Sequence, residues 1–141
     1  MLGWIISKVA KRSVTELTSE LLWQPMGAEQ SAYQTVDGKG VAFAGGGISA
    51  GLRDLGRLGL LVLNEGAINA KQVFPSQVVQ SIKKGGNRAK FTNAFPTLPG
   101  ASYKSQWWVF HNEHNAFAAR GVHGQTIYID PTANMVLVRF A

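Results

Sequence analysis

The clearest structural signal in the chain is the segment Ala118-Ala119-Arg120-Gly121-Val122-His123-Gly124-Gln125-Thr126-Ile127-Tyr128-Ile129-Asp130-Pro131. In its second half, polar positions alternate with Ile127 and Ile129, which is the period-2 pattern of a half-buried strand. Gly121 and Gly124 bracket His123, so that backbone can come close to a ligand without a side chain intervening. The segment therefore predicts two strands joined at a tight polar corner, and the corner is a candidate ligand site.

Further strands are predicted on both sides of this segment. The four strand candidates of the last third of the chain are Tyr103–Phe110, Phe117–Gly121, Gln125–Asp130 and Met135–Phe140. Short connections make consecutive strands antiparallel neighbours, which predicts a meander with helices packed on it. We therefore expect an α+β fold, with residues 1–100 mostly helix and loop and residues 101–141 forming the β meander.

The helices are predicted from apolar spacing and from capping residues. Leu2, Ile5, Ile6 and Val9 share one helical face, and Ser13 to Glu16 matches a capping box that opens a second helix ending near Trp23. A third helix is expected from about Ser49 to a stop at Gly66, and a fourth from Pro75 to Gly85. Between them, Val41–Ala44 is a possible short strand.

Composition limits the classes of protein to which the chain can belong. Its 141 residues suffice for one domain, 1–141, and 45% hydrophobic with 16% charged residues is typical of a globular protein. The chain has no cysteine, which excludes disulfides and thiolate metal sites, and no apolar run is long enough to span a membrane. The net charge of +6 comes without the basic and aromatic signature of a nucleic-acid module, so we expect neither a nucleic-acid nor a membrane partner.

Several segments together resemble one known family. They occur in the family's order over nearly the whole chain, and they are Leu2-Gly3-Trp4-Ile5-Ile6, Leu22-Trp23-Gln24-Pro25-Met26-Gly27, Phe43-Ala44-Gly45-Gly46-Gly47, Leu52-Arg53-Asp54-Leu55, Trp107-Trp108, Gly121-Val122-His123-Gly124-Gln125 and Asp130-Pro131. The ordered set resembles the serine β-lactamase-like superfamily, and within it the class C-type esterases and amide hydrolases that include the aminohexanoate-oligomer hydrolases.

The resemblance implies a mechanism for the longer members of the family. A Ser-x-x-Lys serine attacks an ester or amide carbonyl, a Tyr-x-Asn tyrosine helps to move the proton, and a third motif on a sheet strand closes the site. Here the third motif maps onto Val122, His123 and Gly124, with the N–H of Gln125 as candidate oxyanion donor. His123 would contact substrate or tyrosine, and Gly124 would let a small-molecule ester or amide lie against the strand. The resemblance implies no cofactor.

The resemblance also implies that the nucleophile lies outside this chain. In the family, the Tyr-x-Asn and Ser-x-x-Lys motifs precede the segment that resembles Leu2-Gly3-Trp4, and a closing helix follows the last strand. We therefore expect the C-terminal portion of a roughly threefold longer serine hydrolase, inactive alone. A non-catalytic binding module and an interaction domain that assembles through its sheet edge remain as alternatives.

Two other groups of residues resemble functional sites, a catalytic motif and a metal site. Ser81-Ile82-Lys83-Lys84 fits Ser-x-x-Lys, and Tyr103-Lys104-Ser105 fits a Tyr-x-Ser variant. A lysine at a helix end beside glycines lacks the desolvation that catalysis needs, so we interpret this match as chance. His111 and His114 flank Glu113 and could bind a metal, but solvated turn residues are the favoured interpretation and no metal is expected.

The end of the chain predicts an association surface. Met135–Phe140 is an apolar strand whose family partner would come from the absent N-terminal segment. An unpaired strand edge invites pairing with another chain, so we expect a homo-oligomer through residues 135–140. Trp107 and Trp108 point to opposite faces of their strand, so one is expected in the core and the other at a cleft or an exposed surface.

Overall fold

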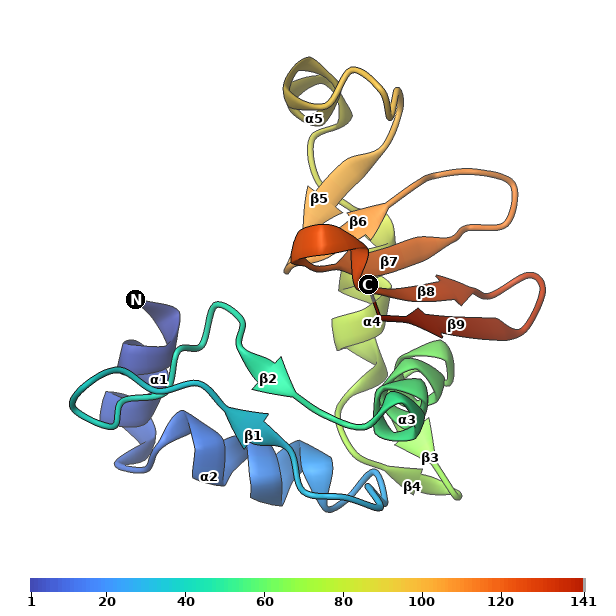
Figure 1. The fold of residues 1–141 in the computed structure, drawn as a ribbon. Helices are drawn as coiled ribbons and strands as arrows, with labels where there is room; N and C mark the ends of the chain where they lie inside the picture. The colour runs from blue at the N-terminus through green and yellow to red at the C-terminus, as the bar shows by residue number, and fades with distance from the viewer. Residues whose placement is uncertain (141) are drawn as a thin grey trace. The chain divides into compact units, whose positions relative to one another are not determined.

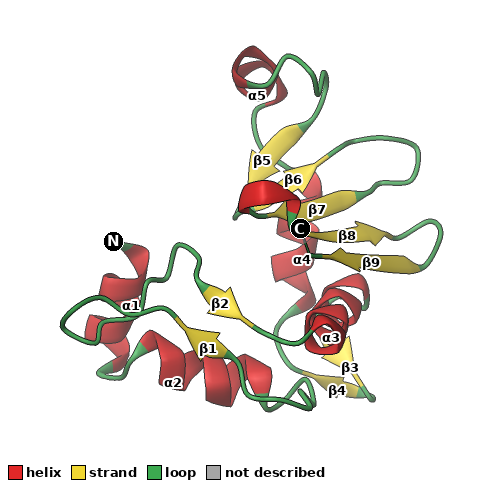
Figure 2. Cartoon of the chain, viewed as in Figure 1, coloured by secondary structure: helices red, strands yellow, loops and turns green. Residues whose placement is uncertain are grey.

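The computed structural model describes residues 1–140, and these fall into two compact units that divide between Asp54 and Leu55. Among the described residues there are five α-helices, two two-stranded sheets and one five-stranded antiparallel sheet (Figures 1 and 2). The predicted α+β fold is confirmed.

The first unit opens with the two predicted helices. Helix α1 (Leu2–Ala10) ends at Lys11, whose backbone is left-handed with φ 54°. Helix α2 (Val14–Thr18) begins with the predicted capping box, in which Ser13 Oγ accepts the Glu16 N–H and the Glu16 carboxylate accepts the Ser13 N–H. The helix continues as a π-helical turn (Ser19–Trp23) and ends at Trp23 as predicted, although the π geometry gave no signal in the sequence.

The rest of the first unit is a loop with little regular structure. Strand β1 (Tyr33–Gln34) pairs antiparallel with β2 (Ile48–Ser49). The strand predicted at Val41–Ala44 is wrong: only Ala42 forms a bridge there, with Val36. The amide of Gln34 donates to the carbonyls of Phe43 and Gly46, and the Thr35 N–H donates to the Gly47 carbonyl, so side-chain and backbone hydrogen bonds together hold the glycine-rich turn.

The helices of the second unit follow the predicted order with two differences. Helix α3 (Leu52–Leu63), which spans the unit boundary, begins later than predicted because β2 occupies residues 48–49. Gly66 follows it with φ 86° and leads into the hairpin of β3 (Ala67–Ile68) and β4 (Lys71–Gln72). Helix α4 (Ser76–Lys84) ends at Gly85 with φ 68°, which confirms the predicted stop. Helix α5 (Arg88–Ala94), capped by the Asn87 side chain, was not predicted.

The sheet has the order β5-β6-β7-β8-β9 with every neighbouring pair antiparallel. Its strands are β5 (Ser102–Lys104), β6 (Trp107–Val109), β7 (Phe117–Arg120), β8 (Thr126–Asp130) and β9 (Met135–Arg139). The single strand predicted at Tyr103–Phe110 is therefore wrong, because a tight turn at Ser105 and Gln106, both with positive φ, splits it into β5 and β6. The predicted meander is otherwise confirmed.

One face of the sheet carries the core. The strand register places one residue of each strand in a single row: Ser102, Val109, Phe117, Ile129 and Val136. The middle of this row packs with Val62 of α3 and with Val79 and Ile82 of α4, the helix that crosses this face in Figure 1. Gly59 brings α3 close to the sheet, since a Cβ there would collide with Val136. We call this the helix-covered face.

The opposite face, which we call the outer face, carries the alternate row. Its members in strand order are Tyr103, Trp108, Ala118, Tyr128 and Leu137. Three of the five are aromatic, and both Tyr103 and Leu137 are about half exposed, at 47% and 48%.

Within residues 1–140, no helix has the length and apolar character needed to cross a bilayer.

Candidate functional site

The corner between β7 and β8 is the site that the sequence singled out. The ladder of β7 and β8 closes at the pair Arg120 and Thr126, and the Gly121 N–H then donates to the Gln125 carbonyl at 2.8 Å. Between these two residues the chain makes a short 3₁₀ turn, Val122–Gly124, in which His123 has φ 64° and Gly124 has φ 97°. The predicted tight polar corner at His123 and Gly124 is confirmed as backbone geometry.

The structure differs from the expectation that the third motif lies on a strand. Strand β7 ends at Arg120, and Val122, His123 and Gly124 lie in the turn beyond it. The Gly124 carbonyl accepts the Thr126 hydroxyl at 3.1 Å, which fixes the turn against the start of β8. The reason is the left-handed backbone at His123 and Gly124, which bends the chain out of the ladder.

All four residues of the corner are exposed on a rigid support. Val122 is 71% exposed, and His123, Gly124 and Gln125 are also in the exposed class. Three residues along the strands from the closing pair of the ladder, Phe117 of β7 and Ile129 of β8 pair with each other and are completely buried. A turn anchored in this way can present an imidazole, an amide side chain and peptide N–H groups to a ligand at a fixed position.

The residues of the chance Ser-x-x-Lys match do not come together. Ser81 lies on α4, which covers one face of the sheet, whereas Tyr103 belongs to the row on the outer face. Lys84 is exposed, and Lys83 forms an ion pair with Glu65 at 2.9 Å. No desolvated lysine stands beside Ser81, so this helix offers no activated serine.

A different serine, which the sequence analysis missed, does contact a histidine. Ser102 is completely buried, its hydroxyl accepts the Gly86 N–H at 3.0 Å, and it lies 2.7 Å from His111 Nε2. Burial, with a contribution from the positive charge of Arg88, lowers the pKa of His111 below its ordinary value of 6.5. The neutral ring can therefore accept the Ser102 proton, but the buried hydroxyl is closed to substrate, so the pair holds β5 and β6 to the end of α4.

The second histidine of that loop has another partner. His114 Nδ1 lies 2.7 Å from the Asp130 carboxylate, whose second oxygen accepts the Ala133 N–H at 2.8 Å. The Ala133 hydrogen bond and the His114 contact lower the pKa of Asp130. His111 and His114 are thus bound to separate partners, and residues 1–140 contain no group of three side chains placed to hold a metal ion.

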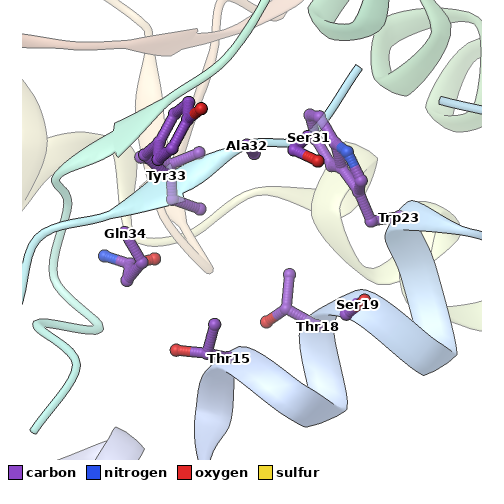
Figure 3. A pocket seen from close by; sticks show the side chains of 9 residues that line it. Thr15, Thr18, Ser19, Trp23, Ser31, Ala32, Tyr33 and Gln34 are labelled. Carbon is purple, nitrogen blue, oxygen red and sulfur yellow. The ribbon is translucent and has the colours of Figure 1, made fainter. Parts of the chain in front are cut away.

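The first unit holds a small pocket of about 190 Å³ (Figure 3). Thr15, Thr18 and Ser19 of the helical segment face Tyr33 and Gln34 of β1 across it. Trp23 closes one end and donates its indole N–H to the Gln30 carbonyl at 2.8 Å. The pocket offers hydroxyl groups and two aromatic rings. No sequence signal marked it, because its two walls come from segments without a shared motif.

The two tryptophans lie on opposite faces of β6, as predicted. Trp107 packs edge-on against Phe117 with the ring centroids 5.3 Å apart, beside the core. Trp108 lies on the outer face among Phe91, Phe95 and Tyr103.

Comparison with known proteins gives two relatives of clear similarity. The chain is 36% identical over 146 aligned residues to a 6-aminohexanoate-dimer hydrolase of Paenarthrobacter ureafaciens, an alignment that covers 100% of this chain and 36% of the relative. It superimposes with a TM-score of 0.89 on a Bacillus anthracis structure described as a candidate 6-aminohexanoate-dimer hydrolase, at 40% identity, over 99% of this chain and 35% of that one. The chain thus spans about a third of the length of these relatives.

A more distant structure supports the same fold. A candidate β-lactamase of Bacteroides dorei superimposes with a TM-score of 0.66 at 17% identity, covering 98% of this chain and 47% of that one. No family model matches the sequence. The ordered sequence segments, the helix-covered antiparallel sheet and the two 6-aminohexanoate-dimer hydrolase relatives agree, and the chain belongs to the serine β-lactamase-like superfamily.

Proposed function

We propose that this chain forms one wall of the active site of a serine hydrolase that cleaves an ester or amide through an acyl-enzyme. In this proposal the chain corresponds to the C-terminal portion of the longer hydrolases, and the nucleophile and its lysine come from the portion that precedes it. The single observation that carries the proposal is the similarity over the whole chain to a 6-aminohexanoate-dimer hydrolase.

The corner at residues 122–125 is the proposed wall. The N–H of Gln125 would donate to the oxyanion that develops when the serine attacks the carbonyl, and a fixed donor in that place stabilises the transition state. His123 would supply a polar contact to substrate, and Val122 and Gly124 would border it. Support comes from the exposure of all four residues and from the buried pair, Phe117 and Ile129, that anchors the strands beneath them.

The same proposal leaves the chain without its own nucleophile. Ser81 has no desolvated lysine beside it, and Ser102 is completely buried against His111. An acyl-enzyme needs a hydroxyl that substrate can reach and a base that takes its proton. The chain alone is therefore expected to be inactive.

A hybrid enzyme tests the proposal. This chain replaces the aligned segment of the Paenarthrobacter relative, and hydrolysis of a nitrophenyl ester and of the 6-aminohexanoate dimer is measured. We expect the hybrid to hydrolyse the ester, and we expect His123→Ala and Gly124→Val to lower kcat/KM. Asn115→Ala is the matched control, because Asn115 has φ 53° like His123 but lies in the β6–β7 loop. A folded hybrid whose kcat/KM is unchanged by both corner substitutions would contradict the assignment of residues 122–125 to the active-site wall.

The alternative proposal is an association module, and the free edge of β9 favours it. Strand β9 is the last in the sheet and pairs only with β8 among the described strands. Met135, Leu137 and Phe140 are 41%, 48% and 50% exposed. Such an edge can pair with the same edge of a second copy, so we propose a homo-oligomer through residues 135–140.

Light scattering after size-exclusion chromatography tests this association. Leu137→Lys places a charge on the proposed interface and should shift the protein toward monomer. Val78→Lys is the matched control, because Val78 on α4 is equally exposed at 48%. A monodisperse monomer at all concentrations would contradict the proposal.

A further inference from the structure

We propose that the first unit binds a small uncharged polyol in the pocket between strand β1 and the helical segment formed by α2 and the π-helical turn. Every residue that lines this pocket lies within residues 15–48, inside the first unit. The proposal therefore depends neither on the hydrolase function nor on the corner at residues 122–125.

The volume of the pocket limits the size of the ligand. The pocket holds about 190 Å³, whereas pockets for drug-sized ligands have volumes of about 300–1,000 Å³. One water molecule takes up about 30 Å³ in the liquid, so this space has room for about six non-hydrogen atoms. Glycerol is a molecule of that size.

The helical wall of the pocket has an unusual backbone. Thr15 of α2, and Ser19 and Trp23 of the π-helical turn, line the pocket at intervals of four residues. In an α-helix with about 3.6 residues per turn, the first and the last of these side chains would point about 80° apart. The wider π turn, in which the Gln24 N–H donates to the Ser19 carbonyl at 2.9 Å, reduces this angle and brings Trp23 to the side of Thr15. Such turns are rare and are frequent at functional sites.

Both walls are held in place by hydrogen bonds. The Trp23 indole N–H donates to the Gln30 carbonyl at 2.8 Å, which ties the end of the helical segment to the chain that leads into β1. On the other wall, Gln34 pairs with Ile48 in the β1–β2 ladder, and its side-chain amide is fixed by the carbonyls of Phe43 and Gly46. The pocket is therefore preformed.

The lining of the pocket is polar but carries no charge. Its polar side chains are hydroxyls and one carboxamide, and Figure 3 shows those of the helical segment facing β1: Thr15, Thr18, Ser19, Ser31 and Gln34. A charged ligand would give up part of its hydration and would find no opposite charge here. The lining therefore selects an uncharged ligand.

The free hydrogen-bonding groups select hydroxyls on the ligand. Within residues 1–140, the hydroxyls of Thr15, Thr18 and Ser31 make no hydrogen bond to another protein group. The Gln34 nitrogen donates to two carbonyls, which leaves the Gln34 side-chain oxygen as an acceptor. A ligand hydroxyl can donate to that oxygen and can both donate to and accept from the protein hydroxyls.

Two aromatic rings account for the carbon skeleton of the ligand. Tyr33 is 75% exposed, and Trp23 is half-buried at one end of the pocket. The C–H groups of a polyol can cover part of these rings, and burying apolar surface is favourable in proportion to its area. A small molecule that has hydroxyls on a short carbon chain meets both requirements.

Titration of the whole chain with glycerol, followed through amide NMR shifts at neutral pH, tests the proposal. We expect a dissociation constant in the millimolar range, because so small a ligand makes few contacts. Aminopropanediol and glycerate have the size of glycerol but carry a positive and a negative charge, and each should bind at least about tenfold more weakly. The shifts should centre on residues 15–23, 31–34 and 48.

Variants that remove single hydroxyls locate the site. Thr18→Val and Ser31→Ala should each weaken glycerol about fivefold, which corresponds to the loss of one hydrogen bond. Ser49→Ala is the matched control, because Ser49 is exposed on β2 but does not line the pocket.

A third variant should reverse the charge preference. Thr15→Asp places a carboxylate in the first turn of α2, where an acidic residue suits the helix, and aminopropanediol should then bind more tightly than glycerol. Equal affinity of the natural chain for glycerol and its charged analogues would overturn the proposal. So would unchanged glycerol binding in Thr18→Val and Ser31→Ala, or shifts that lie outside the first unit.

Discussion

Removal of the Ser102 hydroxyl should destabilise the second unit out of proportion to the single oxygen that is lost. Ser102 is completely buried where β5 meets the end of α4. Its oxygen accepts the Gly86 N–H at 3.0 Å and shares a hydrogen bond of 2.7 Å with His111 Nε2. The Ser102→Ala variant keeps the packing volume nearly constant but leaves two polar groups without their partner.

The size of the effect follows from those two groups. A buried donor or acceptor left unsatisfied costs about 1–3 kcal/mol. The Gly86 N–H is part-buried and His111 is half-buried, so water can satisfy them in part, and we expect a total loss of about 2–4 kcal/mol. Against a domain stability of about 5–15 kcal/mol, this is a large fraction.

Urea unfolding followed through NMR resonances of residues 55–140 measures the loss, and hydrogen exchange at the Gly86 amide locates it. Ser105→Ala is the matched control, because Ser105 is an exposed residue in the turn that follows the same strand. A Ser102→Ala variant that is as stable as the Ser105→Ala control, with a protected Gly86 amide, would refute the reasoning.

The remaining predictions concern single positions. Gly59→Val should destabilise the second unit by about 1–3 kcal/mol, because the new side chain collides with Val136; urea unfolding measures this. Ser13→Ala should remove the capping box and cost the first unit about 1 kcal/mol, seen as earlier loss of its amide signals on heating. Because the Ala133 hydrogen bond lowers the pKa of Asp130, the stability this carboxylate provides is complete above its ordinary pKa of 3.8 and is lost as the pH falls through the folded value. In the Asp130→Asn variant, the free energy of unfolding should change less with pH on the acid side than it does in the natural chain.

His111 adds a second pH dependence. Its pKa is lowered in the folded state, so above the ordinary value of 6.5 the ring is neutral whether the chain is folded or unfolded. As the pH falls below 6.5, the unfolded chain takes up the proton first, and the folded state loses stability. Unfolding free energies measured at several pH values should show this loss in the natural chain and not in His111→Gln.

Local signals made most of the helices and strands predictable. The Ser13 to Glu16 capping box, the alternation around Ile127 and Ile129, and the glycine after α4 each act within a few residues, and each was found where it was predicted. The failures have local causes too. The turn at Ser105 and Gln106 contains neither glycine nor asparagine, so no turn residue marks the point where the strand is split.

The corner was predictable as a turn because two glycines flank His123, but its departure from strand geometry depends on the φ values of His123 and Gly124. The contact between Ser102 and His111 joins residues on two strands, and no motif links them. Such sites arise from packing between distant segments, which single-sequence patterns do not encode.

The most direct test of the central claim is the intact mass of the purified chain after incubation with a fluorophosphonate, which labels activated serines. The claim is that this chain provides a wall of a serine hydrolase site and not its nucleophile. It predicts an unchanged mass for the chain alone and a single adduct on the hybrid in which this chain replaces the aligned segment of the Paenarthrobacter relative. A stoichiometric adduct on the chain alone, lost in Ser81→Ala or in Ser102→Ala, would contradict it.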